Sequence, residues 1–530
     1  MAENAHERYE SYAETILRVL ASSPERPALI TAEGRTVRAG ELCDGVRRAA
    51  AELAARGIGR GSTVSLLTGN QPEALLARYA TNLLGARVVF LGEGMAPEVQ
   101  ARIVTSVGTA MLLVAPAARS AAEALIARLP IVPDVLTLGP ASFGEDLIAH
   151  AAARSPETFA GAVRPEDDWC VKFTGGTTGI PKGVQMAHGP YRHMLTQRAD
   201  RIRADQTGAD RSRADARPPR LLVCTPLAHM AGIVADIVLL AGGTVVLQHP
   251  FDAGDVLAAL GREHITDLWL LPPLLYELLD HPDLPSTDVS ALRRVFYGGT
   301  SVSARRLREA NEAFGPVLHG WYGQTEAGNI AETLPDEHAV TGPGGRPTAG
   351  RAAPGADIEI RAADGTVLPP GEAGEIHVRT PMMMSGYWQQ PELTAHVLRD
   401  GWIRTGDVGC LDADGYLYLL DRLKDIVVVV GGHVYPAELE QLLLTHPAVA
   451  RCAVFGVSRE DGNEEVHAAI VSAEGHEVGS ELVREFVREH KGAMYVPRAV
   501  HVVDAIPLTD IGKPDKKRLR ATVGRTTGRA

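Results

Sequence analysis

Long apolar runs, clustered cysteines and a surplus of basic residues are all missing from this sequence, and each absence excludes a class of protein. The 530 residues contain no stretch of about 20 apolar residues, the length that crosses a bilayer as a helix. The five cysteines lie far apart and form no CxxC pair, which indicates free thiols in a reducing compartment. The formal net charge of −12 argues against non-specific nucleic-acid binding. We therefore expect a cytoplasmic protein with no membrane span and no nucleic-acid partner.

The composition is otherwise ordinary for a globular protein, with 45% hydrophobic and 22% charged residues. At about 100–200 residues per domain, the length predicts at least two domains. Over the first three hundred residues, apolar runs alternate with helical patterns, as in Thr63–Leu67, Pro72–Leu84 and Arg87–Leu91. This alternation predicts parallel sheets that are covered by helices.

Two later segments have different patterns. Short alternating runs from Gly355 to Arg379 predict an antiparallel β-subdomain, and a mixed α+β pattern begins near Asp421. We therefore expect an α/β fold in two parts. Residues 1–422 would form a large N-terminal domain of two parallel-type α/β sheets plus a small β-barrel subdomain, and residues 423–530 a small mobile α+β C-terminal domain. The polar segment Arg201–Arg220 is predicted to be a solvated loop.

A loop rich in glycine and threonine gives the strongest local signal. It follows a predicted strand, Trp169–Phe173, and reads KFTGGTTGIPKG from Lys172 to Gly183. Glycines let backbone N–H groups approach an anion, threonine hydroxyls add donors, and Lys182 supplies compensating charge, which together suit a polyphosphate. A Walker A loop requires Gly directly before the Lys and Ser or Thr directly after it. Pro181 and Gly183 occupy those positions here, so a P-loop nucleotidase is disfavoured.

The loop resembles the phosphate loop of the ANL superfamily of adenylate-forming enzymes, which contains acyl- and aryl-CoA synthetases, peptide-synthetase adenylation domains and luciferases. The usual form has Ser where this chain has Gly175. Seven further segments resemble the family in the expected order between about Arg35 and Arg520: Thr225–Gly232, Tyr297–Thr300, Tyr322–Glu326, Trp402–Asp407, Asp421–Asp425, Gly431–Glu440 and Gly512–Lys513. The Leu91–Pro97 stretch lacks the Pro-rich form that many members have.

The resemblance implies an ATP site in which Tyr322 stacks on adenine and Thr325 contacts the α-phosphate. Asp407 can accept hydrogen bonds from both ribose hydroxyls, because a carboxylate is a two-pronged acceptor, and Arg422 would approach the same sugar. Glu326 would hold Mg²⁺ through hard oxygen ligation. The expected ATP-binding residues are Thr174, Gly175, Gly176, Thr177, Thr178, Gly179, Lys182, Gly299, Thr300, Tyr322, Gly323, Gln324, Asp407 and Arg422.

The small domain would serve both halves of the reaction that the resemblance implies. Lys513 would reach the substrate carboxylate and the α-phosphate, where it stabilises the negative transition state of adenylation. Lys424 matches the hinge about which this domain rotates afterwards. In the second pose, Gly431 and Gly432 would leave room in a channel for the pantetheine arm of coenzyme A.

The acyl pocket is expected to accept a hydrophobic acid, whether fatty, aryl or polycyclic. Its expected lining is His229, Met230, Ala231, Tyr297, Gly298, Gly299, Trp321 and Gly323, with the two glycines of the Tyr297–Thr300 segment leaving space for a chain or ring. Residues 225–232 contain no carboxylate that could pair with an α-ammonium group, which disfavours an amino-acid substrate. His229 is grouped with the catalytic residues Lys513, Glu326 and Thr325 as a gate of the thiol path, not as a general base.

We therefore expect an AMP-forming acyl-CoA synthetase, an acid–thiol ligase that uses ATP, Mg²⁺ and coenzyme A. It would activate the acid as acyl-AMP with pyrophosphate release and then form acyl-CoA and AMP. Coenzyme A is favoured because no carrier-protein domain follows Lys513. A stand-alone ligase that loads a carrier-protein thiol and a non-catalytic protein that binds nucleotide or acyl groups are the alternatives. A homodimer is left open, as is a docking role of Arg201–Arg220 for an acidic partner or for coenzyme A phosphates.

Overall fold

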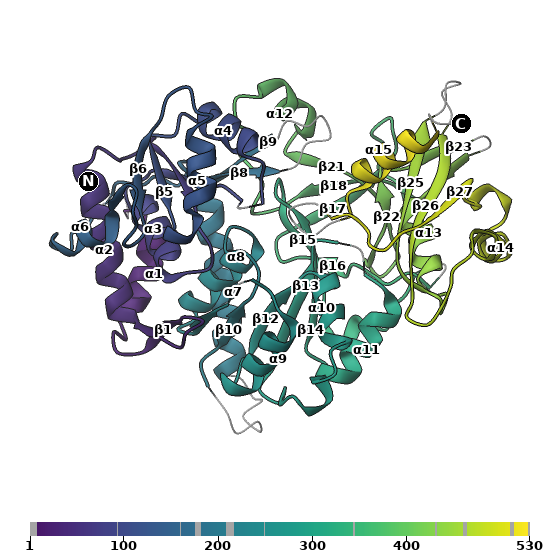
Figure 1. Cartoon of the computed structure of the whole chain (residues 1–530), viewed down its shortest axis with the longest axis horizontal. Helices are drawn as coiled ribbons and strands as arrows, with labels where there is room; N and C mark the ends of the chain where they lie inside the picture. Colours follow the sequence, from purple (N-terminus) through teal and green to yellow (C-terminus); the bar gives the residue numbers. More distant parts are fainter. Residues whose placement is uncertain are drawn as a thin grey trace, which may run out of the picture.

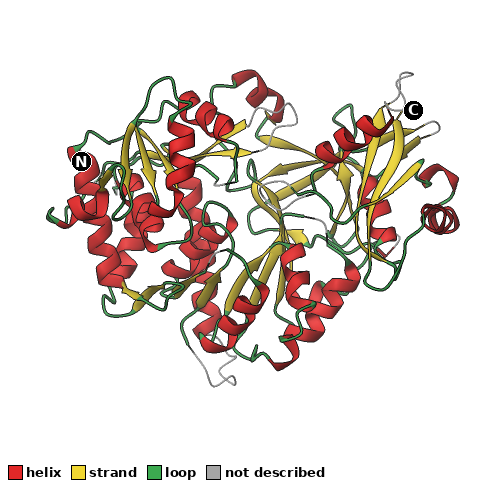
Figure 2. Ribbon diagram, in the orientation of Figure 1, coloured by secondary structure: helices red, strands yellow, loops and turns green. Residues whose placement is uncertain are grey.

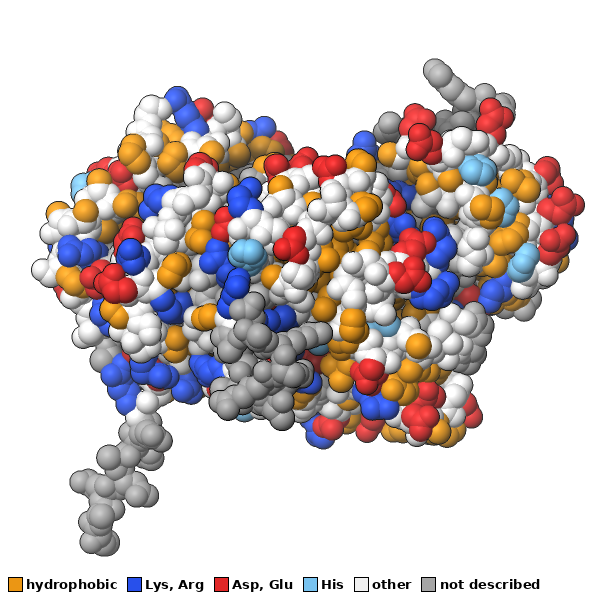
Figure 3. Space-filling model, turned by 90° about the horizontal axis from the view of Figure 1, so that it is seen from below, with side chains coloured by type: hydrophobic (Ala, Val, Ile, Leu, Met, Phe, Trp, Pro, Cys, Tyr) orange, Lys and Arg blue, Asp and Glu red, His pale blue; other side chains and the backbone are white. Residues whose placement is uncertain are grey.

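Two helix-covered sheets, an antiparallel sheet and a small C-terminal unit make up the chain (Figures 1 and 2). The computed structural model describes residues 8–92, 94–159, 161–174, 182–207, 217–248, 250–300, 302–342, 345–429, 432–458, 464–508 and 514–527. Basic and acidic side chains are interspersed over the face shown in Figure 3.

The first large sheet has nine strands in the order β16-β15-β14-β13-β12-β10-β11-β1-β2. The six strands from β14 to β1 in this order pair in parallel, whereas β2, β15 and β16 add antiparallel edges. The strands are β1 (Pro27–Ile30), β2 (Thr36–Arg38), β10 (Arg220–Val223), β11 (Thr244–Leu247), β12 (Asp267–Leu270), β13 (Arg294–Gly298), β14 (Leu318–Gln324), β15 (Gly328–Thr333) and β16 (Arg351–Ala352).

The second large sheet has eight strands in the order β19-β9-β8-β4-β3-β5-β6-β7. Strands β8 and β9 are antiparallel and pair Thr174 with Lys182, so the glycine- and threonine-rich segment connects two neighbouring strands. The strands are β3 (Thr63–Leu67), β4 (Arg87–Phe90), β5 (Met111–Val114), β6 (Asp134–Thr137), β7 (Glu145–Asp146), β8 (Asp168–Thr174), β9 (Lys182–Ala187) and β19 (Gly386–Tyr387).

Helices cover these sheets, and one apolar cluster joins the first three helices with α7, α8 and strands of both sheets. Helix α8 packs against β10, β11 and β12 and also against α1 and α7 (Figure 1). The helices are α1 (Tyr12–Ala21), α2 (Ala39–Ala55), α3 (Pro72–Leu83), α4 (Pro97–Ser106), α5 (Arg119–Ile126), α6 (Leu147–Ala152), α7 (His188–Thr207), α8 (Met230–Leu240), α9 (Ala253–Arg262), α10 (Pro272–Leu279), α11 (Ala304–Phe314) and α12 (Pro391–Val397).

An antiparallel sheet of five strands follows, where the alternating pattern from Gly355 predicted one. Strand β21 is central to it and pairs with three neighbours, and its Asp407 lies opposite Arg422. The strands are β17 (Asp357–Arg361), β18 (Gly374–Arg379), β20 (Leu398–Arg399), β21 (Trp402–Leu411) and β22 (Leu417–Arg422).

The C-terminal unit has its own apolar core and lies at the right of Figure 1. It contains the hairpin of β23 (Val427–Val429) and β24 (Gly432–Val434), a sheet of β25 (Val449–Ser458), β26 (Glu464–Ser472) and β27 (Ala499–Val502), and the helices α13 (Pro436–Leu443), α14 (Ser480–Lys491) and α15 (Lys516–Thr527). The expected α/β class with a small α+β unit is confirmed, whereas the mobility of this unit and the division at residues 422/423 stay predictions.

The prediction of a loop from Arg201 to Arg220 is wrong for the first part of this segment. Helix α7 continues to Thr207 and β10 begins at Arg220, while residues 208–216 lie outside the described residues. The helix holds because Ile202 is buried and Arg203 pairs with Asp200, so a segment that looks uniformly polar still has one apolar anchor.

Among the helices in the described part of the chain, none is both long enough and apolar enough to cross a membrane.

His188 begins α7 in a fully buried position, and neither of its ring nitrogens has a hydrogen-bond partner among the described residues. Burial lowers the pKa of His188 from 6.5 to about 4. Because the unfolded chain regains the ordinary pKa, it binds more protons than the folded chain between pH 6.5 and 4. The stability that the buried neutral ring contributes is therefore complete above about pH 6.5 and is lost as the pH falls towards 4.

We expect His188→Phe to flatten the pH dependence of stability in this window. Up to one proton fewer would be taken up on unfolding, so the slope of the unfolding free energy against pH would fall by at most about 1.4 kcal/mol per pH unit. Urea unfolding at several pH values between 4 and 7.5 measures the slope. His396→Phe, at an exposed position of α12, is the control and should leave it unchanged. An unaltered slope in His188→Phe would contradict the assignment.

Candidate active site

Two side chains from different strands meet at Asp407. The Tyr322 hydroxyl from β14 donates to Oδ2 at 2.7 Å, and Arg422 Nε from β22 lies 2.9 Å from Oδ1. Asp407 is buried, and burial together with this carboxylate raises the pKa of Tyr322, so the phenol stays protonated and remains a donor. A carboxylate has about four lone-pair sites, so two remain for further hydroxyl donors. The predicted adenine and ribose residues are thus brought together.

A second cluster connects Glu326 to the end of the glycine-rich loop. The Tyr387 hydroxyl from β19 donates to Glu326 Oε1 at 2.8 Å, and Lys182 Nζ lies 5.5 Å from the centre of the Tyr387 ring. The backbone N–H of Met384 also donates to the Glu326 carbonyl at 2.8 Å. Tyr387, on the short strand β19, therefore contacts both the predicted metal ligand Glu326 and the loop lysine Lys182. Tyr387 was not among the residues predicted from the sequence. The sequence around it offers no more than an aromatic residue that follows a glycine.

Two buried polar atoms in this region have no hydrogen-bond partner among the described residues: Thr300 Oγ1 and Gln324 Nε2. A buried donor without a partner costs about 1–3 kcal/mol, so such atoms are ordinarily satisfied by a ligand or by water. Both residues belong to the segments predicted to contact ATP. A hydroxyl and an amide N–H match the hydrogen-bonding groups of a nucleotide, so the residues present fit that ligand.

The donor chemistry also fits a magnesium ion that is shared with phosphates. No group of three or more His, Cys, Asp or Glu side chains suited to a metal occurs in the part of the chain that was described. Mg²⁺ does not require one, because it is commonly held by one or two carboxylates, water and substrate phosphates. Glu326 can supply that carboxylate. The remaining ligands would come from the nucleotide and from solvent.

His229 lies at the N-terminus of α8, at the start of the predicted acyl pocket. Burial, and after it the nearby Lys172 ammonium, lower the pKa of His229 to about 4. The imidazole is therefore neutral at physiological pH and can both donate and accept a hydrogen bond. Burial likewise lowers the pKa of Lys172, which lies two residues before the end of β8 at Thr174.

The glycines predicted to open the acyl pocket have a different function. A Cβ at Gly298 would lie 2.2 Å from the Trp321 carbonyl oxygen, and one at Gly323 would lie 2.2 Å from the Gly328 oxygen. Their missing side chains allow close approach of neighbouring backbone and do not leave space for a ligand, which corrects the expectation for Gly298. Gly299 has φ of +86°, a conformation that favours glycine.

The Tyr297 side chain also departs from the expected acyl lining. It packs in the cluster beneath α9–α11, and its hydroxyl lies 3.1 Å from His338 Nε2. Trp321 belongs to the cluster on the other face of the sheet, with Phe296. Only the backbone of Tyr297 can therefore line the space that Trp321 faces.

The remaining predicted residues are divided between described and undescribed segments. Thr174 and Lys182 are described, Lys424 is exposed just after β22, and Gly432 begins β24. Gly323, Thr325, Met230 and Ala231 lie at the ends of β14 and α8. The residues outside the described segments are Gly175, Gly176, Thr177, Thr178, Gly179, Gly431 and Lys513.

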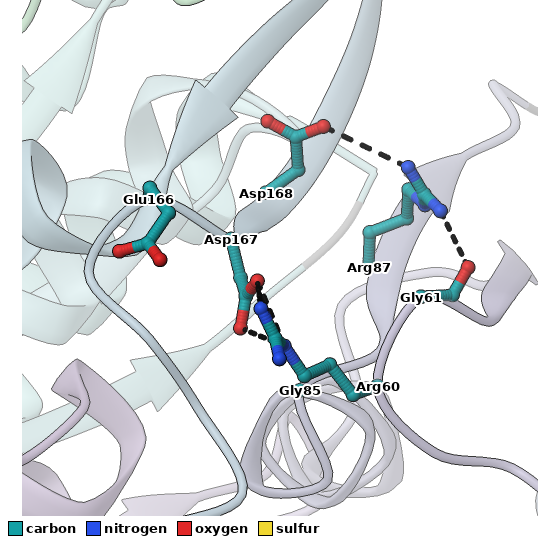
Figure 4. A pocket seen from close by; sticks show the side chains of 7 residues that line it. All are labelled: Arg60, Gly61, Gly85, Arg87, Glu166, Asp167 and Asp168. Atoms are coloured by element: carbon teal, nitrogen blue, oxygen red, sulfur yellow. Dashed lines mark hydrogen bonds and ion pairs between the residues drawn. The ribbon is translucent and has the colours of Figure 1, made fainter.

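A separate cavity of about 460 Å³ opens where β8 begins, at the end of that strand away from the glycine-rich loop (Figure 4). Arg60 makes a two-pronged ion pair with Asp167 at 2.8 Å, and Arg87 lies 3.7 Å from Asp168. The arginines face carboxylates of the same cavity, so their charge is balanced within it. None of the motif residues lines it, so it is distinct from the candidate site.

Asp407, Glu326 and Lys182, the residues predicted to hold a nucleotide and its phosphates, lie in β21, in the turn between β14 and β15, and in β9. The profile described as "AMP-binding enzyme" matches residues 17–388, and that described as "AMP-binding enzyme C-terminal domain" matches residues 438–513. The chain therefore belongs to the AMP-binding family of enzymes, within the ANL superfamily of adenylate-forming ligases, and the predicted membership is confirmed.

Relatives align over nearly the whole chain. The medium/long-chain-fatty-acid–CoA ligase FadD8 of Mycobacterium tuberculosis is 33% identical over 524 residues, which cover 95% of this chain and 89% of the relative. A feruloyl-CoA synthase of an Amycolatopsis species is 34% identical and covers 95% of this chain, 99% of its own. The solved structure of the amide bond synthetase McbA from Marinactinospora thermotolerans is similar with a TM-score of 0.86 at 38% identity, covering 96% of this chain and 99% of McbA.

We expect Asp407→Asn to weaken AMP binding by about ten- to a hundredfold. The amide keeps the size of the carboxylate but turns one acceptor into a donor that faces Tyr322 or Arg422, and hydrogen bonds to charged groups contribute about 1.5–3 kcal/mol. Calorimetric titration with AMP measures the affinity. Asp412→Asn is the matched control, because this turn residue accepts the Tyr418 hydroxyl at 2.8 Å away from the motif residues. Equal affinities of the two variants would contradict the ribose assignment.

Proposed function

We propose that this protein activates a carboxylic acid with ATP, forming an acyl-adenylate and pyrophosphate, and then transfers the acyl group to the thiol of coenzyme A. The observation that carries the proposal is the convergence of Tyr322 and Arg422 on Asp407, with Glu326 connected through Tyr387 to Lys182. Tyr322, Glu326, Tyr387 and Lys182 lie in the segment that matches the AMP-binding profile, whereas Asp407 and Arg422 lie between the two matched segments. Each of these groups suits one part of ATP.

In the first step, a carboxylate oxygen of the acid attacks the α-phosphorus of ATP. A bond forms between that oxygen and phosphorus, and the bond to the pyrophosphate oxygen breaks, so pyrophosphate leaves with the electron pair. Asp407 would hold the ribose hydroxyls, and Lys182 would offset phosphate charge. Mg²⁺ held by Glu326 would supply further neutralisation of the phosphates when bound. Lys513 would be brought by the C-terminal unit to the reacting carboxylate.

In the second step, the acceptor thiol loses its proton to solvent, and the sulfur attacks the acyl carbonyl carbon. The bond from that carbon to the AMP oxygen breaks, and AMP leaves with the electron pair. The His229 imidazole, neutral because its pKa is about 4, would line the path without repelling a cation or attracting the phosphates. Rotation about Lys424 would withdraw Lys513 and bring the β23–β24 hairpin with Gly431 and Gly432 towards the site.

The acceptor is less firmly supported than the adenylation step. FadD8 and the feruloyl-CoA synthase are CoA ligases by name, which favours coenzyme A. Similarity to McbA, an amide bond synthetase by name, favours a second candidate in which an amine attacks the acyl-adenylate and an amide forms. Loading of a carrier-protein thiol is the further alternative. A non-catalytic binding protein is disfavoured because Lys182, Glu326 and Asp407 are all present.

We expect Lys513→Ala to slow acid-dependent pyrophosphate release by about a hundredfold or more, since a charge at the reacting oxygens is lost. Thioester formation from supplied acyl-adenylate should remain largely intact, because the lysine is withdrawn in that step. Coupled pyrophosphate assay and chromatography of acyl-CoA measure the two halves. Lys517→Ala removes an exposed charge nearby and serves as the control. Equal loss of both half-reactions would overturn the two-pose assignment.

The opposite selectivity is expected for Gly432→Leu, in which a side chain would obstruct the channel for the acceptor. Pyrophosphate release should persist, while acyl transfer to coenzyme A falls by at least about tenfold. Gly479→Leu provides the control, because a Cβ there meets no atom within 4 Å and its φ of −87° suits any residue. The same assay with a panel of amines replacing coenzyme A decides between the two acceptors. Unimpaired transfer in Gly432→Leu would remove the channel.

A further inference from the structure

Three aromatic side chains share one face of the first sheet, beside the predicted acyl pocket. Trp269 of β12, Phe296 of β13 and Trp321 of β14 lie in adjacent strands, and the ring of Trp321 is 4.5 Å from Phe296 and 5.8 Å from Trp269. The planes are tilted by 38° in both pairs, and the His319 ring lies 5.4 Å from Phe296. Aromatic residues form only 5% of the chain, so this grouping is a local concentration.

Helix α8 provides the wall opposite these rings. Met230, Val234 and Ile237 are spaced by four and three residues, which places them on one face of the helix. This stripe begins beside His229, where the acyl pocket is predicted to open, and continues towards the buried end of the helix. Val234 and Ile237 are both buried. The stripe and the aromatic face therefore mark out the course of an acyl group that enters past His229.

The course ends in a cavity of about 60 Å³ with Trp321 in its wall. Ligand pockets usually measure about 300–1,000 Å³, so this space is far too small to receive an extended alkyl chain. Its lining includes Val234 and Ile237 of α8, Phe296, and the arginines Arg198, Arg201 and Arg294. The arginines of this lining make ion pairs with acidic side chains, so the rim offers no unbalanced charge for a second carboxylate.

Arg198 of α7 also contacts the indole of Trp321. Its guanidinium carbon lies 4.5 Å from the centre of the Trp321 ring, and it also forms an ion pair with Glu332. Glu332 is the cross-strand partner of Trp321, is 8% exposed, and accepts a hydrogen bond from Asn329 at 2.7 Å. The indole is therefore contacted by a phenyl ring and by a guanidinium whose own position is fixed.

We propose that Trp321, positioned by its contacts with Phe296 and Arg198, closes the far end of the acyl pocket and restricts the substrate to compact aromatic acids, single-ring or fused bicyclic. The inference rests on the proposed function and specifies its substrate class. An aromatic ring gains about 0.5–1.5 kcal/mol from each well-placed aromatic partner beyond area burial, and this face presents three. An alkyl chain of eight or more carbons gains no such contact and meets the indole before it is fully buried.

Arg198 is a positioning residue in this arrangement. Lysine would keep the ion pair with Glu332 but lose the planar face that stacks on the indole. Methionine would lose both. The effect of either change should therefore reach the acid through the orientation of Trp321 and should spare ATP.

Acid-dependent pyrophosphate release with cinnamate, indole-3-acetate, octanoate and dodecanoate tests the proposal. In the wild type, we expect kcat/KM for the better aromatic acid to exceed that for dodecanoate by at least about tenfold, on the scale of two aromatic contacts. Trp321→Ala should lower kcat/KM for the aromatic acid and raise it for dodecanoate, so that the ratio of the two values falls by at least about tenfold. A wild type that prefers dodecanoate, or an unchanged preference in the variant, would overturn the proposal.

Arg198→Met should shift the profile in the same direction by a smaller factor, raising KM and lowering kcat for the aromatic acid while KM for ATP changes little. Arg198→Lys should recover part of the loss. Arg203→Met is the control on the same helix, since Arg203 pairs with Asp200 and donates to the Leu240 carbonyl at the C-terminal end of α8, far along the helix from Met230. A profile in Arg198→Met that matches this control would remove the positioning role.

Two measurements separate this inference from the proposed function and from simple misfolding. If none of the acids drives pyrophosphate release from the wild type, the proposed function fails. Calorimetric binding of indole-3-acetate and dodecanoate to the wild type and to Trp321→Ala then decides the pocket by itself, with aromatic binding lost in the variant as the supporting result. Trp321→Phe, which retains an aromatic wall, should keep the aromatic preference and the melting temperature.

Discussion

The buried carboxylate of Asp236 is the contact on which the placement of the acyl-pocket wall depends. This side chain is fully buried in α8, where it pairs with Arg78 of α3 and accepts hydrogen bonds from Tyr79 and from Tyr191 of α7. Breaking a buried ion pair by removing one partner costs about 3–5 kcal/mol, because the other charge stays buried without compensation. The network therefore joins three helices that lie between the two large sheets.

The network also determines the position of the stripe on α8, since Asp236 stands between Val234 and Ile237. A polar cluster with no chemistry of its own thus fixes the apolar surface along which the acid would lie.

The nucleotide side of the site depends on a different kind of contact, a set of charge-assisted hydrogen bonds across sheets. Asp407 comes from the antiparallel sheet, Tyr322 from the first large sheet and Tyr387 from the second. Just beyond them, Asp421 of β22 accepts a hydrogen bond from the backbone N–H of Ala437, in the first turn of α13, at 2.7 Å. Burial raises the pKa of Asp421 to about 6, and a charged carboxylate at a helix N-terminus is favourable. One of the contacts that hold the C-terminal unit in this pose is therefore adjacent to the predicted hinge, and a rotation about that hinge would strain it.

Local periodicity made much of the fold predictable, and long-range pairing explains most of what was not. The strand Thr63–Leu67 and the helix from Pro72 were recovered because their apolar spacing and terminal residues are local signals. The continuation of α7 through Arg203 was missed because its stability comes from one buried isoleucine and from ion pairs that sequence spacing does not reveal. Tyr387 was missed for the same reason, since its partner Glu326 lies 61 residues away. The space predicted beside Gly298 is filled by backbone, and only the register of β13 and β14 shows this.

Strand β14 relates the two halves of the site, because consecutive residues of a strand point to opposite faces. Trp321 faces the acyl course, and Tyr322, the next residue, donates to the carboxylate predicted to hold the ribose. The residue proposed to end the acyl pocket and the residue that contacts the predicted ribose-binding carboxylate are therefore neighbours in the same strand. An acid of suitable length that rests against the indole would place its carboxylate at a defined distance from the α-phosphate. A longer acid would displace that carboxylate outward, and a misplacement of about 1 Å can cost about a hundredfold in rate. Selection by Trp321 would then act on the rate of adenylation as well as on binding, since the contact that recognises the remote end also positions the reacting one.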